Sequence, residues 1–181
     1  MEEIVCTIVD WAAIVIALCA LGITIWQGIE TRTNNRLSVT PSICLENSWV
    51  PNDEVVGIQI ANKGIGPAKI TNLIIKPNTT TTFGINQQLL FMQYLNKDLK
   101  DKKGGIEYQY QFIDKFQMIS AGETFQFIWL NESDKGDLEV ITNFYDVIKE
   151  FKIEIEYQSI YNEQFYCIES LDFQNTIIVE N

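Results

Sequence analysis

The stretch Trp11–Ile29, WAAIVIALCALGITIWQGI, carries no charged side chain and decides how the rest of the chain must be organised. As a helix, these residues would measure roughly 28 Å, close to the thickness of the hydrocarbon core of a bilayer. Asp10 and Glu30 bracket the stretch, and Trp11 and Trp26 lie near its two ends, where indole rings favour the membrane interface. We therefore predict one transmembrane helix within residues 1–30.

Two other kinds of segment are also long and apolar: a signal peptide and a buried core helix. A cleaved signal peptide has a basic start and a shorter apolar run, whereas this chain begins Met1-Glu2-Glu3. A buried core helix needs protein on every side, and the residues that follow contain enough strand patterns for a core of their own. The sequence therefore favours a membrane span (1–30), a short polar juncture (31–36) and one soluble domain (37–181).

Charge and composition argue against several classes of function. The chain has a net charge of -11 and no histidine. An acidic surface repels phosphate backbones, which argues against nucleic acid as a partner. Without histidine there is no Ser-His-Asp or Cys-His pair and no imidazole-ligated zinc, and no glycine-rich loop fits a nucleotide fingerprint. We expect no catalytic residues, no cofactor and no metal.

Basic residues near the span predict its orientation. Arg32 and Arg36 follow the span and no Lys or Arg precedes it. Because the flank that is richer in Lys and Arg stays inside, the soluble domain is expected in the cytoplasm and the amino terminus outside. The protein is thus expected to be a single-pass protein of the inner (cytoplasmic) membrane.

One side of the predicted span gathers small residues at spacings of three and four. This stripe consists of Asp10, Ala13, Ala17, Ala20, Thr24 and Gly28. Small residues allow helix backbones to approach closely in lipid, which predicts self-association through the stripe, although alanines are common in membrane helices and chance gives the same spacing. Asp10 is either solvated at the interface or, if it lies deeper, a functional ionisable group.

Alternating apolar residues predict strands along the soluble domain. They cover residues 37–45, 55–61, 68–76, 106–113, 116–119, 124–130, 151–157 and 164–171. Residues 55–76 are expected to form one hairpin, and the last two strands another. Apolar spacings of three and four predict a short helix over 85–99 and a second one that begins near Asp137.

Two motifs carry a resemblance to a known group. After the helix come NRLSVTP at 35–41 and NKGIGPA at 62–68, a dense turn whose glycines are expected to take positive φ. Together these features resemble a group of uncharacterised bacterial single-pass membrane proteins. The resemblance implies a mainly β soluble part, an immunoglobulin-like antiparallel β-sandwich, here with one or two short inserted helices. The resemblance implies a membrane anchor and a fold, but the group has no established active site whose residues could be assigned to this chain.

Acidic residues offer two candidate sites. Glu154 and Glu156 are a carboxylate pair of the type used in glycoside hydrolysis, but strand alternation puts both on an exposed face, where acids serve solubility. Residues 131–137, NESDKGD, supply oxygen ligands for calcium but lack the EF-hand pattern. The sequence favours a solvated loop there that caps the helix at Asp137.

Three further residues have alternative interpretations. Trp49, in a turn-like segment, is either an exposed anchor for a partner or for lipid headgroups, or a residue packed at the rim of the core. Cys44 and Cys167 would form a disulfide if their strands were neighbours in an extracytoplasmic domain. In the cytoplasm they would be small buried hydrophobes, which the sequence favours.

These observations favour a non-enzymatic, membrane-anchored module that binds a protein partner or senses a ligand near the bilayer. The alternative is a membrane effector, for example in antiviral defence, whose transmembrane helices oligomerise to perturb the membrane. A carboxylate hydrolase is a third hypothesis and requires two acids in one pocket.

Overall fold

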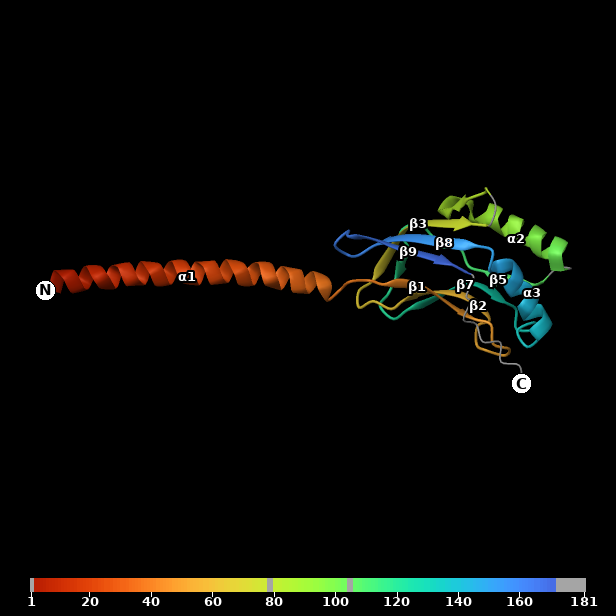
Figure 1. The fold of residues 1–181 in the computed structure, drawn as a ribbon, viewed down its shortest axis with the longest axis horizontal. Coiled ribbons are helices and arrows are strands. Elements are labelled where there is room, and N and C mark those ends of the chain that lie inside the picture. The colour runs from red at the N-terminus through yellow and green to blue at the C-terminus, as the bar shows by residue number, and fades with distance from the viewer. Residues whose placement is uncertain (1, 78–79, 104–105, 172–181) are drawn as a thin grey trace. The chain divides into compact units, whose positions relative to one another are not determined.

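A computed structural model of the chain (Figure 1) describes residues 2–77, 80–103 and 106–171. For residues 2–10, 12, 101–103 and 170 it describes the backbone alone. The chain divides into two units between Ser38 and Val39.

The first unit is a single helix, α1, which runs from Glu2 to Leu37. It includes the polar juncture 31–36, which is therefore helical. The backbone amide of Ser38 still bonds the carbonyl of Asn34 (2.9 Å), and its hydroxyl bonds the carbonyl of Asn35 (2.9 Å). Pro41 follows and cannot donate a helical hydrogen bond. The strand expected from residue 37 begins later, at Ile43.

The second unit contains two antiparallel sheets. The first sheet has the strand order β1-β2-β7-β5. Its strands are β1 (Ile43–Ser48), β2 (Gly57–Asn62), β7 (Thr124–Leu130) and β5 (Tyr108–Tyr110). The second sheet has the order β4-β3-β8-β9, with β6 paired to the start of β3. Its strands are β3 (Ala68–Lys76), β4 (Phe83–Gly84), β6 (Met118–Ile119), β8 (Lys152–Gln158) and β9 (Gln164–Ser170).

One hydrophobic core joins the two sheets and the two helices of the second unit. Inward residues of both sheets, such as Ile60 and Ile155, belong to one cluster of buried side chains. The 3₁₀ turn η1 (Ile85–Gln87) leads into α2 (Gln88–Lys103), and α3 (Leu138–Ile148) follows β7. The structure confirms the predicted mainly β fold, with an N-terminal helix and short inserted helices.

The expected hairpin over residues 55–76 is wrong. Strand β2 pairs with β1 and β7, whereas β3 pairs with β4, β6 and β8, so the turn between β2 and β3 carries the chain from one sheet to the other. The hairpin formed by β8 and β9 is confirmed, with Glu156 opposite Tyr166.

The crossing between the sheets is organised by the side chain of Asn62, which is fully buried. Its Nδ2 donates to the carbonyls of Gly66 (2.8 Å) and Ile119 (3.0 Å). Its Oδ1 accepts from the backbone amides of Ser42 (3.1 Å) and Gly64 (3.0 Å). One amide therefore ties the start of β1, the crossing turn and β6 together, and all four of its hydrogen-bonding positions are used.

The two glycines of this turn are needed for close approach, because neither has the positive φ expected from the sequence. A Cβ on Gly64 would lie 2.4 Å from the backbone nitrogen of Ser42, and a Cβ on Gly66 would lie 1.7 Å from the carbonyl oxygen of Val39. Both distances are far below van der Waals contact. The motif at 62–68 therefore lets the chain that enters the domain pack directly on the turn.

Candidate functional site

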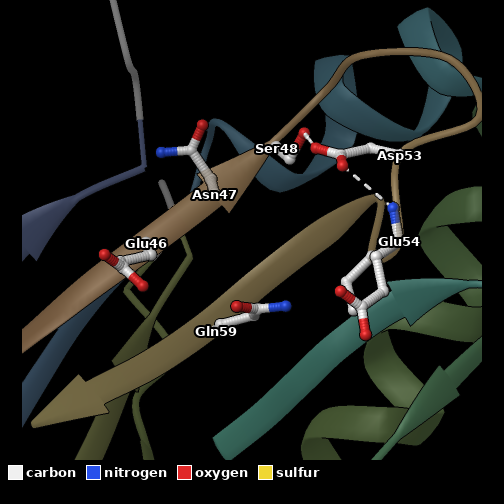
Figure 2. A pocket seen from close by; sticks show the side chains of 7 residues that line it. Glu46, Asn47, Ser48, Asp53, Glu54 and Gln59 are labelled. Carbon is white, nitrogen blue, oxygen red and sulfur yellow. Dashed lines mark hydrogen bonds between the residues drawn. The ribbon is translucent and has the colours of Figure 1, made fainter. Parts of the chain in front are cut away.

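A polar depression of about 410 Å³ opens on the outer side of the β1–β2 hairpin. Figure 2 shows its side chains, which come from β1, from β2 and from the loop between them. The residues that line it are Glu46, Asn47, Ser48, Asp53, Glu54, Val55 and Gln59. Three carboxylates and two amides thus surround one space, an arrangement that suits a ligand with hydrogen-bond donors or positive charge.

Local hydrogen bonds fix the position of Asp53 in this depression. The hydroxyl of Ser48 donates to one of its carboxylate oxygens, and the backbone amide of Glu54 donates to the other at 2.9 Å (Figure 2). These bonds lower the pKa of Asp53, the Ser48 bond most strongly, because they stabilise the charged form. Asp53 is therefore held as a carboxylate, whereas a general acid needs a raised pKa.

The loop that carries Asp53 is held by a segment far away in the sequence. The backbone amide of Asn52 donates to the carbonyl of Lys135 (2.8 Å), and Asn52 has a positive φ of 62°. The Lys135 ammonium also lowers the pKa of Asp53 through its charge. The loop between β7 and α3 thus positions the wall of the depression.

The carboxylates predicted as an acid pair lie elsewhere, on β8. Glu154 bonds Lys76 on β3 (2.7 Å) and Lys152 on its own strand (3.3 Å). The hydrogen bond from Lys76, followed by that from Lys152, lowers the pKa of Glu154. Glu154 therefore serves as an ion-pair partner between strands, and the two acids line none of the depression around Asp53.

The segment 131–137 forms a turn that starts a helix. The carboxylate of Asp137 accepts from the backbone amides of Glu139 (2.9 Å) and Val140 (3.3 Å), and α3 begins at Leu138. The predicted cap is confirmed. Across the part of the chain that the structure describes, no three Asp, Glu or Cys side chains gather as a bound metal ion would require.

Trp49 is buried, with 3% of its surface exposed, so its interpretation as an exposed anchor is wrong. Its ring lies 6.1 Å from Phe144 and 5.2 Å from Tyr145 on α3, and these contacts account for its burial. Its indole N–H has no acceptor among the described residues. Trp49 is the first residue of the loop between β1 and β2, and its side chain belongs to the core.

Cys44 and Cys167 are both free thiols. They lie on β1 and β9, at facing edges of the two sheets, where the amide of Leu45 donates to Glu169 (3.3 Å). Cys167 is buried, and burial, followed by the charge of Glu169, raises its pKa to about 12. Burial is also the main cause of the raised pKa of Cys44. The interpretation as small buried side chains fits Cys167 best.

The predicted helix interface lies on α1. Its residues Ala13, Ala17, Ala20, Thr24 and Gly28 are exposed in the single chain. The Thr24 hydroxyl donates to the carbonyl of Ala20 (2.8 Å), which turns the hydroxyl back onto its own helix. Asp10 lies in the same helix, but its side chain is outside the described residues.

Sequence reasoning missed the depression around Asp53. Glu46 and Gln59 face each other across β1 and β2, a contact that depends on the pairing of these two strands and not on the alternation within either. The position of Asp53 depends on the backbone contact with Lys135, for which the sequence carries no local signal.

Comparison with known proteins identifies a family. No curated protein and no solved structure matched the chain. The profile of one protein family, described as "Domain of unknown function (DUF8453)", matches residues 5–176, which include most of α1 and all the strands described above. Because the match covers nearly the whole chain, the protein belongs to the DUF8453 family.

Proposed function

We propose that the protein is a non-enzymatic, membrane-anchored binding module, and that the depression around Asp53 receives a cationic group of a protein partner close to the bilayer. The observation that carries this proposal is that Glu46, Asp53 and Glu54 all line one depression. Among the described residues, no Lys or Arg forms an ion pair with Asp53 or Glu54 within 4.0 Å. Glu46 already pairs with Lys63, and a guanidinium or ammonium group of the partner would supply positive charge for Asp53 and Glu54.

Helix α1 supports the anchoring part of the proposal. It contains one stretch, Ala13–Leu37, that is long and apolar enough to cross a membrane, and none of its most apolar window is buried. With Arg32 and Arg36 following the span, the soluble domain faces the cytoplasm of a bacterial inner membrane. Alkaline phosphatase fused after Asn181 should then be inactive. Active phosphatase would overturn this orientation.

The depression is tested by removing its charge. The full chain in detergent is titrated with a short arginine peptide by calorimetry, with the triple variant E46Q/D53N/E54Q beside it. We expect affinity to fall about tenfold or more, because charge-assisted hydrogen bonds are lost. The control E107Q/E139Q/E156Q removes the same charge outside the depression and should bind as the native chain does. An equal loss of affinity in the two triple variants would show that binding depends only on the net charge of the protein, and would overturn the depression as the binding site.

A second candidate is the effector function, in which spans associate through the stripe defined by Ala13, Ala17, Ala20, Thr24 and Gly28. It is supported by the Thr24 hydroxyl, which bonds the carbonyl of Ala20 in its own helix and so leaves this side of the helix without an unpaired hydroxyl donor. Close approach of a second helix requires such a surface.

Crosslinking of the full chain in lipid tests this candidate. Ala17→Leu and Ala20→Leu should abolish oligomers and any toxicity on expression, since added side chains keep the backbones apart. Gly22→Leu, on the opposite side of the helix, adds a side chain of the same size, is the matched control and should leave oligomers intact. Unchanged oligomers in the alanine variants would remove the effector hypothesis.

A further inference from the structure

Three loops of the sandwich come together at the end where the chain enters the domain (Figure 1). The turn between β2 and β3 touches the entering chain, since the amide of Ile65 donates to the carbonyl of Thr40 (3.1 Å). Strand β6 pairs with the start of β3, where Lys69 lies opposite Met118. The end of β8 lies beside the same residue, with Lys69 opposite Gln158. We call these loops, residues 63–69, 111–123 and 158–164, the entry rim.

Each loop of the entry rim exposes large apolar side chains. Ile65 is 67% exposed, and Ile160 and Tyr161, in the turn between β8 and β9, are about half exposed. Phe116 and Met118 are exposed in the third loop. Single exposed apolar residues are ordinary, but their presence on all three loops at one end indicates a contact surface.

Phe116 has an unusual and well-bonded backbone conformation. Its φ is +72°, a conformation that aromatic residues rarely adopt. Its amide donates to the carbonyl of Ile70 (2.7 Å), which fixes the loop against β3. The ammonium groups of Lys69 and Lys115 lie 4.7 and 5.2 Å from the centre of its ring. An aromatic ring flanked by lysines is the pairing found where proteins meet the headgroup layer of a membrane.

The charge of the entry rim differs from that of the whole chain. Its charged residues are Lys63, Lys69, Asp114, Lys115, Glu123 and Glu163, three of each sign. The entry rim therefore carries no net charge, in a chain whose net charge is -11. Two of the acids are engaged locally: Glu123 accepts from the amide of Ser120 (2.6 Å) and Glu163 from the hydroxyl of Ser159 (3.2 Å). Repulsion from anionic headgroups is thus weakest here.

Chain length keeps this end of the domain near a membrane that α1 spans. The helical residues after Ile29, as far as Leu37, add about 12 Å at 1.5 Å per residue. The headgroup layer on one side of a bilayer is about 5–8 Å thick. Val39, where the domain begins, follows two residues later, so the domain begins only several ångströms beyond the headgroup layer.

We propose that the entry rim rests on the bilayer, with Ile65, Phe116 and Ile160 inserted at the level of the lipid headgroups. This inference depends on the membrane anchoring proposed above and adds a second, peripheral contact between the domain and the lipid. The domain is then held at two places, by its chain connection and by its loops. Two attachments fix the orientation of the domain on the membrane, and so which surface of the sandwich faces the cytoplasm.

The experiment uses the full chain in phosphatidylcholine nanodiscs that contain lipids with a spin label at the headgroup. All four cysteines are replaced by alanine, and one cysteine carrying a fluorescent probe is introduced at Ile65 or Ile160. Val50 and Leu138, with 51% and 42% exposure, lie outside the entry rim and provide matched control positions. A fifth sample keeps native Cys19 in the span as the only labelled cysteine. Circular dichroism checks that each variant is folded.

We expect quenching at positions 65 and 160 to exceed that at 50 and 138 about twofold or more, because insertion brings the probe into the labelled layer. Equal quenching at the four positions would overturn the contact of the entry rim with the bilayer. If the probe at Cys19 is at the same time protected from a water-soluble quencher, the membrane anchor is still supported. A probe at Cys19 that stays accessible to a water-soluble quencher would overturn the anchor and this inference together.

Discussion

The side-chain amide of Asn62 donates a 2.8 Å hydrogen bond to the carbonyl of Gly66, within the turn that carries the chain between the two sheets. The same side chain bonds Ser42, Gly64 and Ile119 and has no exposed surface. The crossing between sheets therefore depends on one buried amide.

Replacing Asn62 by alanine should lower the free energy of unfolding by about 3 kcal/mol or more, because two backbone donors and two carbonyls lose their partner in a buried site. Asn62→Asp should be similarly destabilising, since a carboxylate would face the carbonyls of Gly66 and Ile119. Urea unfolding of the full chain in detergent, followed by circular dichroism, measures the loss. Asn96→Ala, at an exposed position on α2, should change it little. A loss at Asn62 no larger than at Asn96 would contradict its role.

Gly66→Ala should destabilise the domain by more than about 2 kcal/mol, because the new Cβ would overlap the carbonyl of Val39 and shift the backbone. Gly84→Ala is the matched control. The nearest atom to its Cβ would be the side-chain oxygen of Gln87 at 3.9 Å, and its φ of -87° suits alanine. Thermal unfolding of both variants compares them directly, and equal melting temperatures would refute the close-approach explanation.

Asp137→Ala should cost about 1 kcal/mol, the usual loss when a helix N-cap is removed. Asp137→Ser should restore most of that stability, since serine accepts the same backbone hydrogen bonds. The free energy of unfolding in urea is again the measure. If serine and alanine were equally destabilising, the charge of Asp137 and not its capping bonds would be responsible.

Trp49→Ala should cost about 3–5 kcal/mol, as expected for a large buried aromatic residue. Trp49→Phe should cost less than half as much, because it keeps ring contacts with Phe144 and Tyr145 and removes a buried N–H that has no described acceptor. Chemical unfolding separates the two variants. A phenylalanine variant as unstable as the alanine variant would show that the N–H has a partner.

Alkaline pH should destabilise the domain through Cys167. Its folded pKa, about 12, lies above the ordinary value of 9.0, so above pH 9 the unfolded chain loses a proton that the folded chain keeps. Stability is then lost as the pH rises from about 9 towards 12. Burial raises the pKa of Tyr108 to about 12 as well, which adds to the loss above its ordinary value of 10.0. Thermal unfolding of Cys167→Val should depend less steeply on pH in this range than unfolding of the native chain, and an unchanged slope would exclude Cys167 as a contributor.

The strands that could be predicted from sequence are those with a local pattern. Phe151, Ile153, Ile155 and Tyr157 alternate with polar residues, and all four are buried. Burial of every second residue is a property of a single strand and needs no knowledge of its neighbours. Strand β3 is less regular, because a bulge between Ile70 and Asn72 shifts the alternation, yet its bounds agree with the prediction.

Pairing between strands and the candidate site could not be predicted in the same way. The sequence of the turn at 62–68 fits a hairpin as well as a crossing between sheets, and the choice depends on contacts of Asn62 with Ser42 and Ile119. Burial of Trp49 likewise depends on α3, almost a hundred residues further along the chain. Such contacts between distant segments leave no periodic trace in the sequence.

The Asn62 turn also determines how the domain responds to mechanical force. The carbonyls of Thr40 and Ser42 accept hydrogen bonds from Ile65 and Lys63 (3.1 and 2.8 Å), so the entering chain is bonded to the turn before β1 begins. A pull transmitted through α1 would load these bonds and the Asn62 amide before it could separate β1 from β2. The hydrogen bonds of this turn would therefore bear a force applied through the anchor before the hydrogen bonds between β1 and β2 do.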